Sequence, residues 1–190
     1  GEQWAVDHIF KEIEKVFGRL TKTIHTFTNC GVRHIQDPKT FEVTMGQTEY
    51  IAALKPITSS ELTGADSVTV CSTALQQLFM SLLGAVAFCQ LTRLDVAIFV
   101  VALQRRTQSA QHIHVRRLNA LVRWLQRHPK QITYRRFPTS TAVLKCISDS
   151  AFKKEQERGH AIKGAVYLRA PAPGTGEPRP GTLDPTQRPG

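Results

Sequence analysis

The sequence has no acidic residue over a long stretch of its second half. Residues 96–148 contain no Asp or Glu. A solvated surface usually mixes both signs of charge, because mixed charges favour solubility and local ion pairs. The whole chain has a formal net charge of +10. This excess predicts an acidic partner, such as nucleic acid or an anionic surface, and carries no information about the fold.

Clustered cysteines are also lacking. Cys30, Cys71, Cys89 and Cys146 are scattered, with no C-x-x-C pair and no histidine at a matching spacing. We therefore expect no zinc site, and we predict reduced thiols in an intracellular protein.

Apolar runs are short. The longest, LFMSLLGAVAFC at 78–89, falls below the roughly 20 residues of a membrane helix and predicts a buried helix instead. The N-terminal GEQWAVDHIFKEIEKVF is charged and amphipathic, unlike a signal peptide. We expect no membrane contact, and Gly1 in place of Met suggests a fragment of a longer protein.

Hydrophobic periodicity predicts a mixed α+β chain. A polar, glycine-containing loop is expected at 59–72, and the six Pro and four Gly of 171–190 predict a disordered tail. The predicted hairpin at 23–46 has its turn near Asp37–Lys39. The predicted helices lie at 3–17, 47–57, 73–90, 92–107 and about 110–127. The other predicted strands lie at 131–137, 140–150 and 159–170.

The segment HVRRLNALVRWLQRHPKQITYRR (114–136) is basic and contains no acid. On a helical wheel, the apolar residues gather on one side, and Arg116, Arg123 and Arg127 lie about 140–180° from Leu118. This arrangement predicts phosphate contacts on one face and core packing on the other. The alternative is that acids from elsewhere in the chain, or from a partner, face these arginines. The apolar positions are Leu118, Leu121, Val122 and Leu125, and the predicted nucleic-acid contacts are Arg116, Arg117, Arg123, Arg127 and Lys130.

The catalytic candidates are few. Asp149 follows the apolar segment AVLKCI, where a carboxylate could hold a divalent metal, although turn and cap roles are commoner for a single Asp. His112 and His114 could form a metal pair, although histidines beside arginines at a helix end are usually structural. A hydrolase using Asp149 with one of them is a further alternative, but no complete catalytic set is evident.

The order of motifs over residues 1–170 resembles a copia-type retrotransposon polyprotein, from the late reverse transcriptase into the ribonuclease H-like domain. The first helix and Phe17-Gly18 resemble the helix after the strand that bears the polymerase aspartates. The hairpin followed by Gln47-x-x-Tyr50-Ile51 is similar to the family's hairpin and Q-x-x-Y-I helix, where the thumb begins.

Two further segments carry the resemblance. LFMSLLGAVAFCQLTRLDVA (78–97) is similar to the family's "GSLMYL…TRPDI" segment, with Leu94 in place of the usual proline. The helix from His114 to Leu125 resembles its "H-W-x-A-x-x-R-I-L-R-Y-L" helix, with Trp124 in the aromatic position. The matching residues of the two segments are Gly84, Thr92, Arg93, Asp95, His114, Arg123 and Leu125.

The last part of the resemblance concerns the ribonuclease H-like domain. Residues 147–150 resemble the strand that supplies its first metal-binding aspartate, which would be Asp149, and 164–167 resemble its second strand. The sequence departs from the family at Ala151-Phe152, where an acid and a tryptophan are expected. The polymerase aspartates would precede residue 1, and the other ribonuclease acids would follow residue 170.

The resemblance implies four regions. These are a palm and thumb remnant of the reverse transcriptase (1–58), a helical connection (59–138), partial ribonuclease H-like strands (139–170) and the disordered tail (171–190). It implies an ancestral RNA-directed DNA polymerase that uses Mg²⁺. We expect that this chain alone neither binds Mg²⁺ stably nor catalyses the reaction. The expected partners are an RNA–DNA hybrid or duplex and the rest of the polyprotein. The alternative is a non-enzymatic relic whose basic helix docks an acidic protein.

Overall fold

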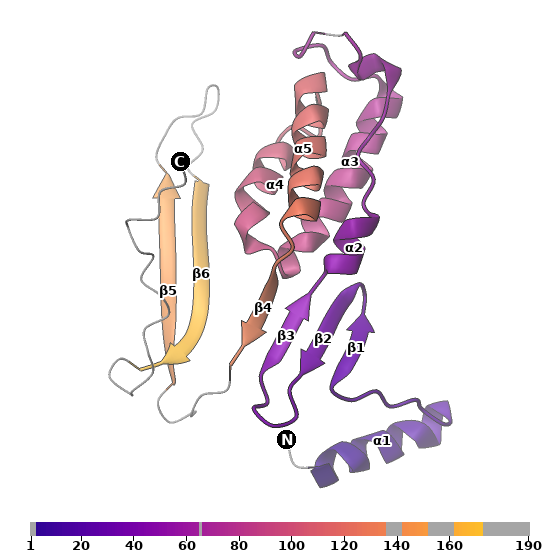
Figure 1. Ribbon diagram of the computed structural model, residues 1–190, viewed down its shortest axis with the longest axis vertical. Helices are drawn as coiled ribbons and strands as arrows, with labels where there is room; N and C mark the ends of the chain where they lie inside the picture. Colours follow the sequence, from indigo (N-terminus) through magenta and orange to yellow (C-terminus); the bar gives the residue numbers. More distant parts are fainter. Residues whose placement is uncertain (1–2, 65, 136–141, 152–161, 173–190) are drawn as a thin grey trace. The chain divides into compact units, whose positions relative to one another are not determined.

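The computed structural model describes residues 3–64, 66–135, 142–151 and 162–172 (Figure 1). The chain divides into two compact units, Gly1–Arg135 and Arg136–Gly190. Both units contain elements of the predicted α+β class: helices and a sheet in the first, strands in the second. The disordered tail predicted at 171–190 lies, from residue 173 on, outside the described residues.

The first helix, α1 (Gln3–Phe17), confirms the prediction for 3–17. Gly18 ends it with a φ of +80°, a left-handed conformation that glycine adopts without steric cost. The apolar side of α1 is largely exposed within the described part of the chain: none of its residues is buried, and Trp4 is 69% exposed. Amphipathic periodicity therefore identified the helix but not a packing partner.

A four-stranded antiparallel sheet follows, in the order β1-β2-β3-β4 (Figure 1). The predicted turn near Asp37–Lys39 is confirmed: it joins β2 to β3, and the Asp37 carboxylate accepts hydrogen bonds from the backbone N–H groups of Lys39 (2.7 Å) and Thr40 (2.8 Å). These two bonds also lower the pKa of Asp37. The strands are β1 (Thr26–Asn29), β2 (Val32–Gln36), β3 (Val43–Gly46) and β4 (Gln131–Tyr134).

Two features of the sheet differ from a single hairpin at 23–46. A second tight turn joins β1 to β2 through Cys30 (φ 47°) and Gly31 (φ 74°), and this pair of positive φ angles suits the twist of a two-residue hairpin loop. In addition, β4 pairs with β3 from nearly ninety residues further along the chain. The sheet thus joins residues on both sides of the expected boundary at 58.

The remaining helices of the first unit lie within the ranges that the periodicity predicts, with shorter bounds. The helix predicted at 92–107 is divided into a 3₁₀ turn and a short α-helix, and the loop predicted at 59–72 contains a further 3₁₀ turn. The α-helices are α2 (Thr48–Ala53), α3 (Thr73–Phe88), α4 (Ala97–Gln104) and α5 (His112–Arg127). The 3₁₀ turns are η1 (Ser60–Leu62), η2 (Cys89–Leu91) and η3 (Leu94–Val96).

The core lies among α3, α4 and α5, which run side by side in Figure 1 and contact one another. The four apolar residues predicted to face the core from α5, Leu118, Leu121, Val122 and Leu125, are all buried. Burial of a side chain of this size stabilises a fold by about 1.5–3 kcal/mol relative to exposure. The apolar stripe of α5 therefore anchors this helix to the core.

Helix α3 contributes the other large part of the core. It buries Leu75, Phe79, Leu82, Leu83 and Val86, as predicted for the apolar run at 78–89. Together with η2 it forms the one described helix, Thr73–Leu91, that is long and apolar enough to cross a membrane by length and composition. Core helices of soluble proteins meet the same two criteria.

The second unit contains two long strands, β5 (Ala142–Ala151) and β6 (Ile162–Pro171), paired antiparallel. They confirm the strands predicted at 140–150 and 159–170. Asp149 lies opposite Gly164 in the register of this pair. The ribonuclease H-like identity of the two strands remains a proposal.

Candidate nucleic-acid interface

The five predicted phosphate contacts lie on α5 or just beyond its end, but their surroundings differ. Arg117, Arg123 and Arg127 are exposed, Lys130 is exposed after the helix, and Arg116 is half-buried. The Nε of Arg127 donates a hydrogen bond to the carbonyl oxygen of Arg123 (3.2 Å). We call Arg117, Arg123 and Arg127 the arginine ridge.

Arg116 has a structural role that the helical wheel did not indicate. Its guanidinium donates to the Ser67 hydroxyl (3.0 Å) and to the Leu62 carbonyl oxygen (2.9 Å). These partners precede Arg116 by about fifty residues, so the sequence pattern of the helix alone carries no sign of them. Arg116 thereby holds the loop 59–72 against α5.

Lys130 faces an acid, as the alternative interpretation of the basic stretch anticipated. Its ammonium lies 3.3 Å from Asp95 Oδ2. The same carboxylate accepts two hydrogen bonds from Arg93, at 2.9 Å from Nε and 3.0 Å from one terminal nitrogen. The hydrogen bonds from Arg93, and after them those from Lys130, lower the pKa of Asp95 despite its partial burial. Part of the positive charge is therefore neutralised within the fold.

Arg93 is the most deeply enclosed charge among the described residues, with its side chain 0% exposed. It also donates to the His128 carbonyl oxygen (2.8 Å) just after the end of α5, and its guanidinium lies 5.1 Å from the Trp124 ring. Buried charges are stable only when they are paired and hydrogen-bonded. Arg93 and Asp95, noted in the sequence only as matches to a motif, thus fix the C-terminal end of α5.

The other matching motif residues also form structural contacts. The Thr92 hydroxyl donates to the Gln47 side-chain oxygen (2.8 Å) in a buried position. The Tyr50 hydroxyl donates to the Ala85 carbonyl oxygen (3.2 Å), and its ring meets the Phe88 ring edge-on. These contacts join the start of α2 to α3 and η2. They account for the motif residues by packing rather than by catalysis.

The two histidines do not form a metal pair. Residues two apart on a helix point to different sides, and His114 Nδ1 accepts a hydrogen bond from the Gln111 N–H (2.9 Å), which caps α5. Burial lowers the pKa of His114, and the positive charges of Arg106 and Arg117 lower it further. His112 is buried with its Nε2 3.8 Å from Glu61 Oε2. Across the described ranges, no group of three or more metal-binding side chains is found.

The lowered pKa of His114 also identifies a basic residue, Arg106, that the sequence pattern did not indicate. Arg106, just after α4, is exposed and close enough to His114 to shift its pKa together with Arg117. The chain reversal between α4 and α5 places Arg106 near His114. Tertiary proximity of this kind leaves no periodic signal in the sequence.

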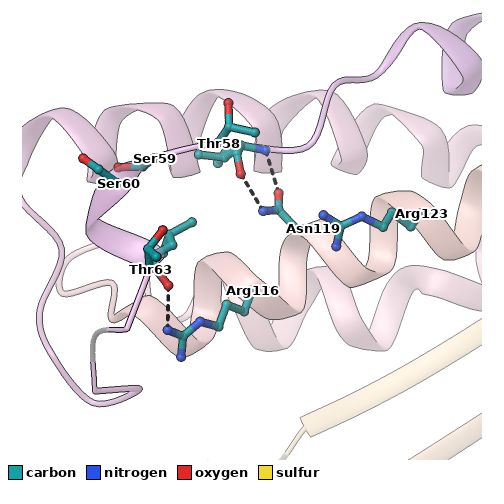
Figure 2. Close-up of a pocket in the computed structure, with 9 residues that line it drawn as sticks. Thr58, Ser59, Ser60, Thr63, Arg116, Asn119 and Arg123 are labelled. Carbon is teal, nitrogen blue, oxygen red and sulfur yellow. Dashed lines mark hydrogen bonds between the residues drawn. The ribbon is translucent and has the colours of Figure 1, made fainter.

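An open groove lies beside the arginine ridge, between residues 57–63 and α5, with a volume of about 640 Å³. Figure 2 shows Arg116 and Arg123 extending from α5 toward this segment, with Asn119 between them. The hydroxyl-bearing residues that line the groove are Thr58, Ser59, Ser60 and Thr63. The sequence indicated the arginines but not these hydroxyl groups, which lie far from α5 along the chain.

The last predicted site residue, Asp149, lies in β5 near its C-terminal end. Its backbone pairs with Gly164, and its side chain lies outside the described structure. Comparison of the chain with protein-family models, with curated proteins and with solved structures gives no match.

Proposed function

We propose that this chain is part of a copia-type reverse transcriptase and that it binds the phosphate backbone of an RNA–DNA hybrid or duplex through α5. The observation that carries the proposal is the arginine ridge, which is exposed on a helix that contains no acidic residue. The opposite side of the helix is buried in the core, so core packing fixes the position of the helix that carries the ridge.

The spacing of the ridge suits a nucleic-acid strand. Arg123 and Arg127 are one helical turn apart, a rise of about 6 Å, and a strand of duplex DNA carries one charge per roughly 3.4 Å of its axis. Two guanidinium groups at this separation can contact two phosphates of one strand. Such contacts fix the position of the duplex without reading its sequence.

Catalysis is not part of the proposed function of this chain alone. Phosphoryl transfer by two metal ions needs several carboxylates that converge on Mg²⁺, and Asp149 is proposed only as a vestigial metal position. We expect the purified chain with Mg²⁺ to leave a primer on an RNA template unextended. Extension above a heat-inactivated control would contradict this expectation.

Binding is tested by fluorescence anisotropy with a labelled RNA–DNA hybrid, a DNA duplex of the same sequence and an acidic polypeptide. The proposal predicts saturable binding to both nucleic acids that weakens as the salt concentration rises. Binding of the acidic polypeptide alone would favour the alternative, in which α5 docks an acidic protein. Affinity for the hybrid that is insensitive to salt would also refute the phosphate contacts.

A further inference from the structure

Helix α4 exposes an apolar face to solvent. The opposite side of the helix packs beside α3 and α5, and there Val100 and Leu103 are buried in the core (Figure 1). On the outward side, Ile98 is 70% exposed and Phe99 is 56% exposed. Within the described residues, the fold therefore fixes this helix but leaves one apolar face open. We call this face the α4 patch, and its residues are Leu94, Ile98, Phe99, Val101 and Ala102.

Helix geometry makes the α4 patch continuous. Residues three and four apart lie side by side on a helix surface, so Ala102 adjoins both Ile98 and Phe99, and Val101 adjoins Ile98. Leu94 extends the patch from the 3₁₀ turn that directly precedes α4. Together these residues expose on the order of 400 Å² of apolar surface, which is the size of the largest patch on a typical monomeric protein. Patches of this size are often functional.

Positive charge borders the α4 patch at both ends. The Arg105 N–H donates to the carbonyl oxygen four residues earlier (3.2 Å), so Arg105 continues the line of the patch by one helical turn, and exposed Arg106 follows it. At the other end, the Lys130 ammonium lies 3.3 Å from the Asp95 carboxylate. Asp95 is already paired within the fold, and no other acid follows it in the chain until residue 149. A ligand of the patch therefore meets apolar surface between basic residues.

We propose that the α4 patch is a docking site for an acidic amphipathic helix of a partner protein. Such a helix presents apolar side chains at the i, i+3, i+4 and i+7 positions, which would pack on the patch. Carboxylates beside its apolar stripe would face Arg105 and Arg106, and complementary charges of this kind select the partner and speed its association. A patch of this size predicts a small interface of the transient kind. The proposal concerns α4 and does not rest on nucleic-acid binding by α5.

Other ligands fit the α4 patch less well. Two copies of the chain would bring identical basic borders together, and each copy already has a net charge of +10, so like charges would oppose their association. A helix that lies on a membrane surface carries a charged side opposite its apolar side. Helix α4 contains no charged residue, and its opposite side is buried. A nucleic-acid backbone would find no side-chain donor on the patch itself.

The test uses the complete chain and a labelled peptide of about 18 residues, long enough to form a helix. The peptide carries leucine at the i, i+3, i+4 and i+7 positions and glutamate and alanine elsewhere. We expect saturable binding by fluorescence anisotropy. Ile98→Gln with Phe99→Gln should weaken it by about tenfold or more, because the two largest apolar contacts are lost. Arg105→Gln with Arg106→Gln should weaken it several-fold and reduce its dependence on salt.

Two matched controls remove the same kinds of side chain from other places. Ile24→Gln with Val68→Gln replaces two exposed apolar residues outside α4, and Arg123→Gln with Arg127→Gln removes two charges from the arginine ridge. Both controls should bind the peptide as the parent chain does. Circular dichroism and thermal melting establish that each variant is folded. A peptide of the same composition, with its leucines distributed around the helix, should bind at least tenfold more weakly.

Several results would overturn the proposal. Equal binding of the two peptides would mean that charge alone attracts them. An equal loss of binding in the Arg123, Arg127 variant and the Arg105, Arg106 variant would assign the acidic partner to α5. A dimer in sedimentation velocity that the Ile98, Phe99 variant cannot form would assign the patch to a second copy of the chain. Binding to phosphatidylserine vesicles without binding to the peptide would assign it to a membrane. None of these results depends on whether the chain binds the RNA–DNA hybrid.

Discussion

Removal of the two ridge arginines that are one turn apart should change the salt dependence of duplex binding by a calculable amount. The ridge offers three exposed guanidinium groups, Arg117, Arg123 and Arg127. For B-form DNA, the slope of log K against log salt concentration is about −0.9 for each phosphate contact. Three contacts therefore predict a slope of about −2.7. This slope corresponds to roughly a 40-fold loss of affinity between ~50 and ~200 mM salt. Arg123→Gln with Arg127→Gln leaves one contact, a slope of about −0.9 and roughly a 3.5-fold loss over the same range.

The assay is anisotropy of a labelled DNA duplex at four or more salt concentrations, with the hybrid measured in parallel. Glutamine is chosen because its helix propensity is close to that of arginine. Lys11→Gln with Arg19→Gln removes the same net charge from exposed positions outside α5, so this control should keep a slope near that of the parent chain. Equal slopes for the parent chain and the Arg123, Arg127 variant would refute the ridge as the contact surface.

Three further predictions concern the fold that carries the ridge. Leu118→Ala should reduce the free energy of unfolding by about 3 kcal/mol, measured by urea denaturation, because Leu118 is fully buried. Asp95→Ala should cost about 3 kcal/mol near neutral pH, because it leaves Arg93 buried without its partner. Since the folded-state pKa of Asp95 is lowered, its contribution is present above the unfolded-state pKa and is lost as pH falls through the folded value, so the variant and parent should converge in acid. Cys89 is buried with its pKa raised to about 11 by desolvation, so at pH 8 a thiol reagent should label exposed Cys30 quickly and Cys89 only after unfolding.

Periodicity predicts well the features that depend on one element at a time. The apolar stripe of α5 had to be buried, because no other arrangement removes Leu118, Val122 and Leu125 from water together, and the structure buries all three. The same reasoning correctly placed α3 and the turn at Asp37, where the local sequence itself supplies the hydrogen-bond acceptor. These features are set by neighbours within a few residues.

Features that depend on distant segments could not be predicted in this way. The helical wheel placed Arg116 with Arg123 and Arg127, since it represents a helix in isolation. In the fold, Leu62 and Ser67 lie against Arg116. Likewise, nothing in QITY indicates that β4 joins β3.

Contacts within the fold that already occupy basic residues also limit how strongly this chain alone could bind nucleic acid. Arg116 holds a loop and Lys130 contacts Asp95, so two of the five predicted phosphate contacts are already engaged in the fold. Three ridge contacts, or four if Lys130 exchanges Asp95 for a phosphate, are fewer than the roughly 6–10 phosphate contacts that give strong and steeply salt-dependent binding to DNA. Firm binding would therefore need further contacts from another part of the proposed polyprotein. The α5 ridge would then act as one secondary contact that orients a duplex, which suits a segment proposed to join a polymerase to a ribonuclease.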